Sequence, residues 1–236
     1  MLIDAGRRAE LAANLERVRE RIALACAAVG RPPDAVTLTA VTKTYPASDV
    51  LLLAGLGVTD VAENRDQEAS IKAGAVRAGG ARPRWHFVGQ LQRNKVKSVL
   101  GYADVVESVD SVRLAEALGR AAAGRQDPLE VLIQVSLDGD PARGGVAGDD
   151  LWRVSDAVTS SEGLRLGGLM AVAPLGEDPG AAFARLAVIA AQMASRHPGS
   201  TTVSAGMSGD LEAAVRYGAT HVRIGTSLLG MRNSLR

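Results

Sequence analysis

Eight short strand-like runs alternate with seven helical runs along the chain, and this alternation predicts an α/β fold: a single (β/α)8 barrel of the TIM type with an extra N-terminal helix. Parallel strands need long crossovers, and the helical runs supply them. The length of 236 residues is close to the roughly 250 typical of such a barrel. No linker rich in Pro, Gly or Ser divides the chain, so we expect one domain over residues 1–236.

The extra N-terminal helix is expected to begin near Glu10. From Leu11 to Val29 apolar residues recur at spacings of three and four, and Gly30 with two following prolines ends the pattern. Strands are expected near residues 37–42, 58–62, 84–88, 103–107, 129–136, 165–170, 201–204 and 220–224. Helices are expected between them, over 47–55, 65–79, 93–100, 110–123, 149–161, 178–195 and 208–217. Little helical sequence follows the eighth strand, so the N-terminal helix is expected to cover the gap there.

An open, doubly wound sheet is the alternative fold. It would place a ligand where the strand order reverses, but it usually has fewer strands than the eight counted here. Residues 137–150, "LDGDPARGGVAGDD", form a long loop with a charged tip and do not separate two domains.

Composition excludes several functional classes. Lys and Arg number 27 against 26 Asp and Glu, and no basic block stands apart, so we expect neither nucleic acid nor a membrane as a partner. The single cysteine, Cys26, falls in the helical pattern and is expected to be a buried apolar side chain. The N-terminus has no signal-peptide pattern and no apolar run reaches membrane-spanning length, so we expect a cytoplasmic protein.

Distinctive polar residues follow the strands at their C-terminal ends, which share one rim in a barrel. Lys43 ends the first strand in "VTLTAVTKTYP", and Asn64 follows the second in "AENRDQE". The loop "SAGMSGD" follows the seventh strand and "RIGT" ends the eighth. Loops after these two strands commonly bind phosphate in barrels, so the pairing indicates a phosphate site, although a plain turn with a helix cap remains the alternative.

Lys43 could use such a phosphate site. A partly desolvated amine loses its proton more easily and condenses with an aldehyde as a Schiff base. Pyridoxal 5′-phosphate (PLP) is an aldehyde that carries a phosphate. A solvated or salt-bridged lysine is the alternative at this position.

Seven segments, in order from about residue 36 to 230, resemble the pyridoxal phosphate homeostasis protein family, which is related to the barrel domain of alanine racemase. They are "LTAVTKTYPASDV", "AENRDQEA", "RWHFVGQLQRNKVK", "VESVDS", "GLRLGGLMAVAP", "VSAGMSGDLEAAV" and "HVRIGTSLLG". The resemblance implies that Lys43 forms the Schiff base and that Asn64 lies beside the cofactor. It places Ser204, Gly206, Met207, Ser208, Gly225 and Thr226 around the phosphate.

The resemblance also implies that Arg223 faces the pyridine nitrogen. Because arginine is always cationic, it disfavours a proton on that nitrogen and weakens the ring as an electron sink. We therefore expect a protein that binds PLP and takes part in its intracellular buffering or delivery to PLP-dependent apo-enzymes, without strong catalysis. No catalytic residue is assigned beyond the Schiff-base lysine.

Two other functions stay open. A weak amino-acid racemase or Schiff-base aldolase would remove α-deuterium from amino acids, and a phosphate-binding barrel would use Lys43 only as a charge. The three histidines have no metal-ligand spacing, so no metal site is expected; His86 is interpreted as a barrel-interior residue, His197 as part of an exposed turn, and His221 as lying at the opposite rim. No long exposed apolar stripe is evident, which favours a monomer.

Overall fold

The computed structural model describes residues 5–140 and 143–230, and in this part of the chain eight parallel strands close into a barrel in sequence order. The strands are β1 (Thr37–Val41), β2 (Asp60–Glu63), β3 (Arg84–Phe87), β4 (Val105–Val109), β5 (Leu129–Gln134), β6 (Leu164–Met170), β7 (Thr202–Ser204) and β8 (His221–Ile224). Pairing of β8 with β1 closes the ring, and Thr39 is in register with Arg223. The (β/α)8 barrel expected from the sequence is confirmed, and the open sheet is excluded.

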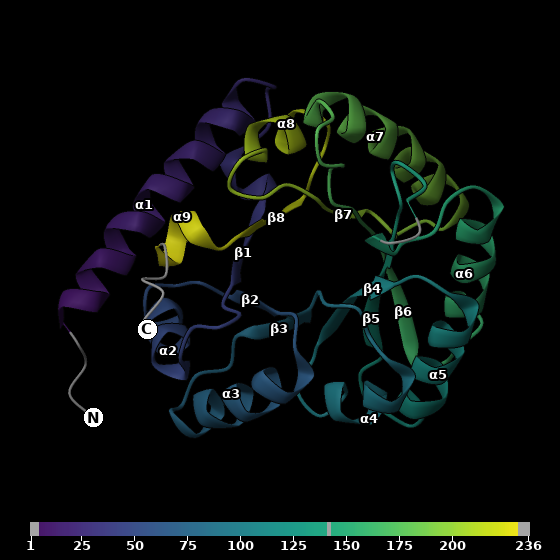
Figure 1. The fold of residues 1–236 in the computed structure, drawn as a ribbon, viewed down its shortest axis with the longest axis horizontal. Coiled ribbons are helices and arrows are strands. Elements are labelled where there is room, and N and C mark those ends of the chain that lie inside the picture. The colour runs from purple at the N-terminus through teal and green to yellow at the C-terminus, as the bar shows by residue number, and fades with distance from the viewer. Residues whose placement is uncertain (1–4, 141–142, 231–236) are drawn as a thin grey trace.

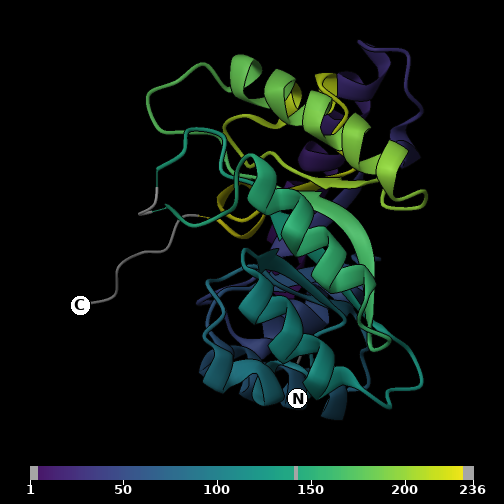
Figure 2. The same cartoon turned by 90° about the vertical axis from the view of Figure 1, so that its right-hand side faces the viewer.

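Helices surround the strands (Figure 1). They are α1 (Ala5–Ala27), α2 (Ala47–Gly55), α3 (Asp66–Ala78), α4 (Val96–Val99), α5 (Val112–Ala122), α6 (Asp149–Thr159), α7 (Pro179–Arg196), α8 (Leu211–Arg216) and α9 (Thr226–Leu229), with two short 3-10 turns, η1 (Pro33–Ala35) and η2 (Arg93–Lys95). The helices α5, α6 and α7, coloured teal to green, step along one flank of the barrel, which faces the viewer in Figure 2.

Helix α1 covers the place where an eighth crossover helix would lie, as the sequence predicts. It lies along α8 and α9 on the outside of the barrel (Figure 1). The buried amide of Asn14 donates a hydrogen bond to the carbonyl of Leu228 at 2.9 Å, and Arg7 donates to the carbonyl of Leu229. Cys26 is fully buried in this helix, as expected. These contacts fix the segment that follows β8.

Element boundaries differ from the expected ones by a few residues. Helix α1 begins at Ala5 rather than near Glu10 and ends before Val29, which is exposed. The helix expected over 93–100 divides into η2 and the short α4. The strand expected over 103–107 lies two residues later, because Ala103 and Asp104 belong to the turn before β4. When an apolar run continues into the turn beside a strand, the sequence pattern cannot show where the strand itself begins.

The core lies mainly between the strands and the helices. It consists of aliphatic side chains from the outward faces of the strands and the inward faces of the helices, with Phe87 and Phe183 among the largest fully buried side chains. Inside the barrel a small apolar cluster of Val105, Leu132 and Met170 accompanies polar residues. The barrel therefore encloses a mixed interior beneath its C-terminal rim.

Candidate functional site

Lys43 lies in the turn between β1 and α2, at the C-terminal rim. Its side chain is exposed, and within residues 5–140 and 143–230 it makes no hydrogen bond or ion pair. The backbone around it is closely held, since the amide of Tyr45 donates to the carbonyl of Thr42 at 3.0 Å. A cation on a fixed turn with no partner is available to a ligand.

Asn64 follows β2 on the same rim. Its side-chain Oδ1 is buried and accepts no hydrogen bond from the described residues. Gly89, after β3, packs so closely on Asn64 that a Cβ there would lie 2.1 Å from the Asn64 carbonyl oxygen. Because a buried polar atom without a partner costs free energy, the Asn64 amide has an unused capacity for a ligand.

The loop after β7 turns sharply towards α8. Gly206 has φ +92°, and a Cβ there would lie 2.5 Å from the Cβ of Ala214, so this position requires glycine. The Met207 amide donates to the carboxylate of Asp210, while the Met207 side chain is exposed. Arg21 of α1 donates to the carbonyl of Ser208 at 3.1 Å and holds the loop against the N-terminal helix.

The segment after β8 meets this loop. The hydroxyl of Thr226 lies 3.5 Å from that of Ser208. Gly225 lies against β1, where a Cβ added to it would be 3.5 Å from the Cβ of Val41. The two loops singled out in the sequence are thus joined in space, beside the strand that leads to Lys43.

Arg223 and Ser204 lie inside the barrel below this rim. The Arg223 guanidinium is buried and donates to the Ser204 hydroxyl at 2.7 Å and to the carbonyl of Ala171 at 2.9 Å. The Ser204 hydroxyl donates to Glu107 at 2.6 Å, and an Arg223 nitrogen lies 3.8 Å from the same Glu107 oxygen. Burial lowers the pKa of Arg223, and the charge of Glu107 opposes that effect.

A second buried cation completes this interior network. The two ring nitrogens of His86 lie 2.7 Å from Glu107 and 2.9 Å from Asp60. Burial disfavours the charged ring, but the bonds to Asp60 and Glu107 outweigh it and raise the pKa of His86 to about 9. Burial likewise acts to raise the pKa of Glu107, but His86, Arg223 and Ser204 lower it to about 2. The negative charges of Asp60 and Glu107 are therefore balanced by the positive charges of His86 and Arg223 inside the barrel.

Sequence reasoning interpreted His86 correctly as a barrel-interior residue, and His221 does open β8 at the opposite rim. His197, expected in an exposed turn, is half-buried and contacts the Ser155 hydroxyl at 3.1 Å. Glu107 was missed. The available signal was a carboxylate in "VVESV", an otherwise apolar strand, because an acid in a buried strand needs partners.

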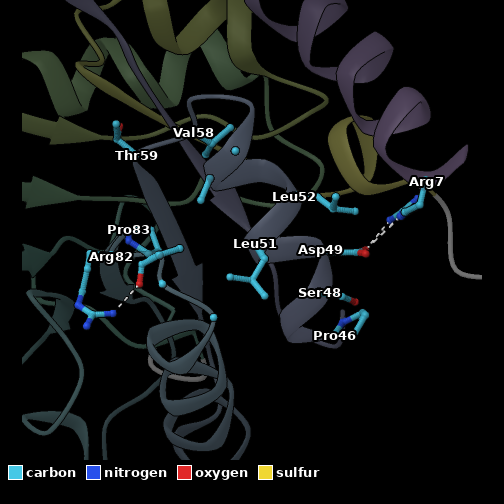
Figure 3. Close-up of a pocket in the computed structure, with 15 residues that line it drawn as sticks. Arg7, Pro46, Ser48, Asp49, Leu51, Leu52, Val58, Thr59, Arg82 and Pro83 are labelled. Carbon is cyan, nitrogen blue, oxygen red and sulfur yellow. Dashed lines mark hydrogen bonds and ion pairs between the residues drawn. The ribbon is translucent and has the colours of Figure 1, made fainter. Parts of the chain in front are cut away.

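A groove of about 1300 Å³ lies outside the barrel, between α2 and the segment that follows α3 (Figure 3). Leu51 and Leu52 of α2 line it together with Val58 and Pro83, and Arg7 with Asp49 closes one end (Figure 3). None of the site residues expected from the sequence lines this groove. The groove is therefore separate from the candidate site, because the polar residues expected from the sequence lie at the rim or inside the barrel.

Within the described residues, no group of three or more His, Cys, Asp or Glu side chains is arranged to hold a metal ion. No helix in the same part of the chain is long and apolar enough to cross a membrane.

Known proteins share this sequence and fold. The family model of the alanine racemase N-terminal domain matches residues 9–233. A pyridoxal phosphate homeostasis protein of Mycobacterium leprae is 43% identical over 244 residues, covering 97% of this chain and 95% of the relative. The solved structure of PipY from Synechococcus elongatus with PLP bound is 32% identical, with a TM-score of 0.81 over 93% of this chain and 100% of that chain. The chain therefore belongs to the alanine racemase N-terminal domain family and, within it, to the pyridoxal phosphate homeostasis proteins.

Proposed function

We propose that this protein binds PLP as a Schiff base on Lys43 and takes part in intracellular PLP homeostasis, by buffering the cofactor or delivering it to PLP-dependent apo-enzymes. The observation that carries the proposal is the convergence of an unpaired lysine and an unsatisfied buried amide oxygen, that of Asn64, on one barrel rim. The relatives named for PLP homeostasis, and the related PipY with PLP bound, support the same cofactor.

The residues on the rim fit this cofactor. Lys43 supplies the amine that reacts with the aldehyde. The Asn64 Oδ1 can accept a hydrogen bond from that amine or from a donor group on the cofactor ring. The hydroxyls of Ser208 and Thr226 can donate to a phosphate. Gly206 and Gly225 shape the two loops that carry these hydroxyls, because a Cβ at Gly206 would meet Ala214 and one at Gly225 would meet Val41. Ser204 supports the site indirectly, through its bonds to Glu107 and Arg223.

Binding without strong catalysis is favoured by two features. Arg223, directed at the pyridine nitrogen as the family resemblance implies, would leave that nitrogen without a proton, so the ring would stabilise carbanions poorly. The Tyr45 hydroxyl, two residues from Lys43, donates to the carbonyl of Gly230 at 2.6 Å and is already engaged. The rim thus offers few groups for moving protons at a bound amino acid.

The proposal extends to the state of the protein in the cell. A single domain over residues 1–236, a monomer and a cytoplasmic location agree with one closed barrel, with the single buried cysteine and with scattered rather than continuous exposed apolar side chains. Sedimentation would test the monomeric state, and cell fractionation would test the cytoplasmic location.

Lys43→Ala tests the role of the lysine. The variant should lose the visible absorbance of a PLP Schiff base and bind PLP at least about tenfold more weakly, which corresponds to about 1.4 kcal/mol. Binding should persist through the phosphate contacts. Absorbance and equilibrium titration measure both effects, with Arg77→Ala, an exposed position in the last turn of α3, as a control that changes neither. Unchanged affinity in Lys43→Ala would refute the proposed role.

A further inference from the structure

The turn that carries Lys43 holds a strained residue. Thr44 has φ +72°, and it is the one non-glycine residue with positive φ in the described part of the chain. A β-branched residue rarely adopts this conformation, because its side chain crowds the backbone there. Such strain persists only where surrounding contacts hold it, and it is often found at functional sites.

A buried ionic cluster lies directly beneath this turn. We name Glu63, Glu68 and Lys72 the clamp. The Lys72 ammonium, 5% exposed, lies 2.6 Å from a Glu63 oxygen and 2.9 Å from a Glu68 oxygen. It comes from α3, while Glu63 ends β2. Burial raises the pKa of Glu63, and the bonds from Lys72 and Thr42 oppose that rise.

The clamp bonds the peptide groups on both sides of Lys43. Lys72 donates to the carbonyl of Thr42, the residue before Lys43, at 2.7 Å. Glu68 accepts from the amide of Thr44, the residue after it. The Thr42 hydroxyl also donates to Glu63 at 2.6 Å. The backbone of Lys43 is therefore fixed from both ends, although its side chain has no partner of its own.

Stability alone is a poor reason for such a cluster. Replacing a buried ion pair by apolar residues of similar volume is often neutral or stabilising, because burying the charges has a large desolvation cost. Here one oxygen of Glu63 is buried and has no hydrogen-bond partner among the described residues, which adds to that cost. If the clamp orients Lys43, that role would explain why charged residues occupy this buried position.

We propose that the clamp of Glu63, Glu68 and Lys72 positions Lys43 for its reaction with the PLP aldehyde; this rests on the proposed function. The neutral amine bonds to the aldehyde carbon, loses its two protons, and the aldehyde oxygen leaves with them as water. The reaction requires the Lys43 amine nitrogen to lie beside the aldehyde carbon of PLP. If the turn that carries Lys43 could relax, the nitrogen would occupy that position for a smaller fraction of the time. The three residues are positioning residues, because they act through the backbone on both sides of Lys43.

Pyridoxine 5′-phosphate distinguishes a loss of Lys43 positioning from a general loss of folding. It carries an alcohol in place of the aldehyde and cannot form a Schiff base, so its binding depends on the folded site but not on the reaction of Lys43. In Lys72→Met the affinity for PLP should fall about tenfold and the borohydride-trapped fraction should fall with it. The affinity for pyridoxine 5′-phosphate should stay within about twofold of the unsubstituted protein. Arg77→Met, which removes an exposed cation from the same helix, should change neither.

Equal losses for both ligands, or no loss for either, would overturn the proposal. If Lys72→Met does not fold, Glu68→Met replaces it, since the Glu68 side chain is 29% exposed and its loss frees the Thr44 amide. An unsubstituted protein that gives no trapped adduct would instead refute the proposed function, so the two failures are distinguishable.

Thr44→Gly provides a rescue. Glycine adopts positive φ without strain, so the turn should need the clamp less. The double variant Thr44→Gly/Lys72→Met should recover part of the PLP affinity that Lys72→Met loses. Absence of any recovery would contradict the claim that the clamp acts by holding the strained turn.

Discussion

His86 illustrates how single residues in this barrel depend on distant parts of the sequence. Its charge is held by Asp60, 26 positions away, and by Glu107, 21 positions away. The sequence placed His86 in the barrel interior, but neither partner could be named, because the closed sheet brings the three strands together. The same holds for Lys43: its place at the rim was predictable, whereas the clamp beneath it was not.

The pH dependence of stability should report on this network. His86 has its pKa raised from 6.5 to about 9, so its contribution is complete below pH 6.5 and is lost as pH rises through about 9. Glu107 has its pKa lowered from 4.5 to about 2, so its contribution is complete above pH 4.5 and is lost as pH falls towards 2. Denaturant unfolding should therefore show a decline in stability between pH 6.5 and 9.

The variant His86→Gln should be less stable than the unsubstituted protein at pH 6. It should also lose most of the decline in stability expected between pH 6.5 and 9. His197→Gln, which alters the half-buried histidine after α7, should retain the decline. A decline of the same size in His86→Gln would show that another group is responsible.

At the scale of elements, periodicity predicted the number, order and approximate place of the strands and of the long helices. It failed where the backbone is irregular. Contacts with α1 hold the four-residue helix α9, and the bulge in β6 interrupts its register with β5; neither element has an apolar period of its own. Gly168, in that bulge, has φ +149°, and a Cβ there would lie 2.0 Å from the Thr202 carbonyl oxygen.

Gly168→Ala should therefore be strongly destabilising. The methyl group would strain the backbone and separate β6 from β7, so we expect a loss of about 3 kcal/mol in the free energy of unfolding. Gly209→Ala is the matched control, because an added Cβ there has no atom within 4 Å. Thermal or chemical denaturation measures both; equal stability of the two variants would contradict the close approach described here.

At the scale of the whole molecule, the closed strand order brings β1 and β2 beside β8 and β7, so loops from both ends of the chain share one rim. Four of the cations without a described ion pair follow strands on the rim that carries Lys43. We call Arg65, Arg93, Lys95 and Lys97 the basic strip; it follows β2 and β3, and the bond from Ser98 to Asp66 joins its two segments at 2.7 Å. The net charge of the chain is close to zero, so a count of charged residues does not reveal the basic strip.

The basic strip should accelerate PLP capture, because the cofactor is an anion. In stopped-flow absorbance, the association rate should fall as salt is raised, since the Debye length is about 8 Å at 0.15 M. The triple variant Arg65→Gln/Arg93→Gln/Lys97→Gln should associate up to about tenfold more slowly at low salt, with an unchanged dissociation rate. Arg77→Gln/Arg216→Gln, at the ends of α3 and α8, is the control. A change confined to the dissociation rate would refute steering.

Borohydride reduction of the PLP-loaded protein, followed by peptide mass analysis, tests the central claim most directly. The chain has only four lysines, at positions 43, 72, 95 and 97, so the modified residue can be assigned without ambiguity. We predict one pyridoxyl phosphate group per chain, on the peptide that contains Lys43. Label on another lysine, or a protein that acquires neither visible absorbance nor label, would contradict it.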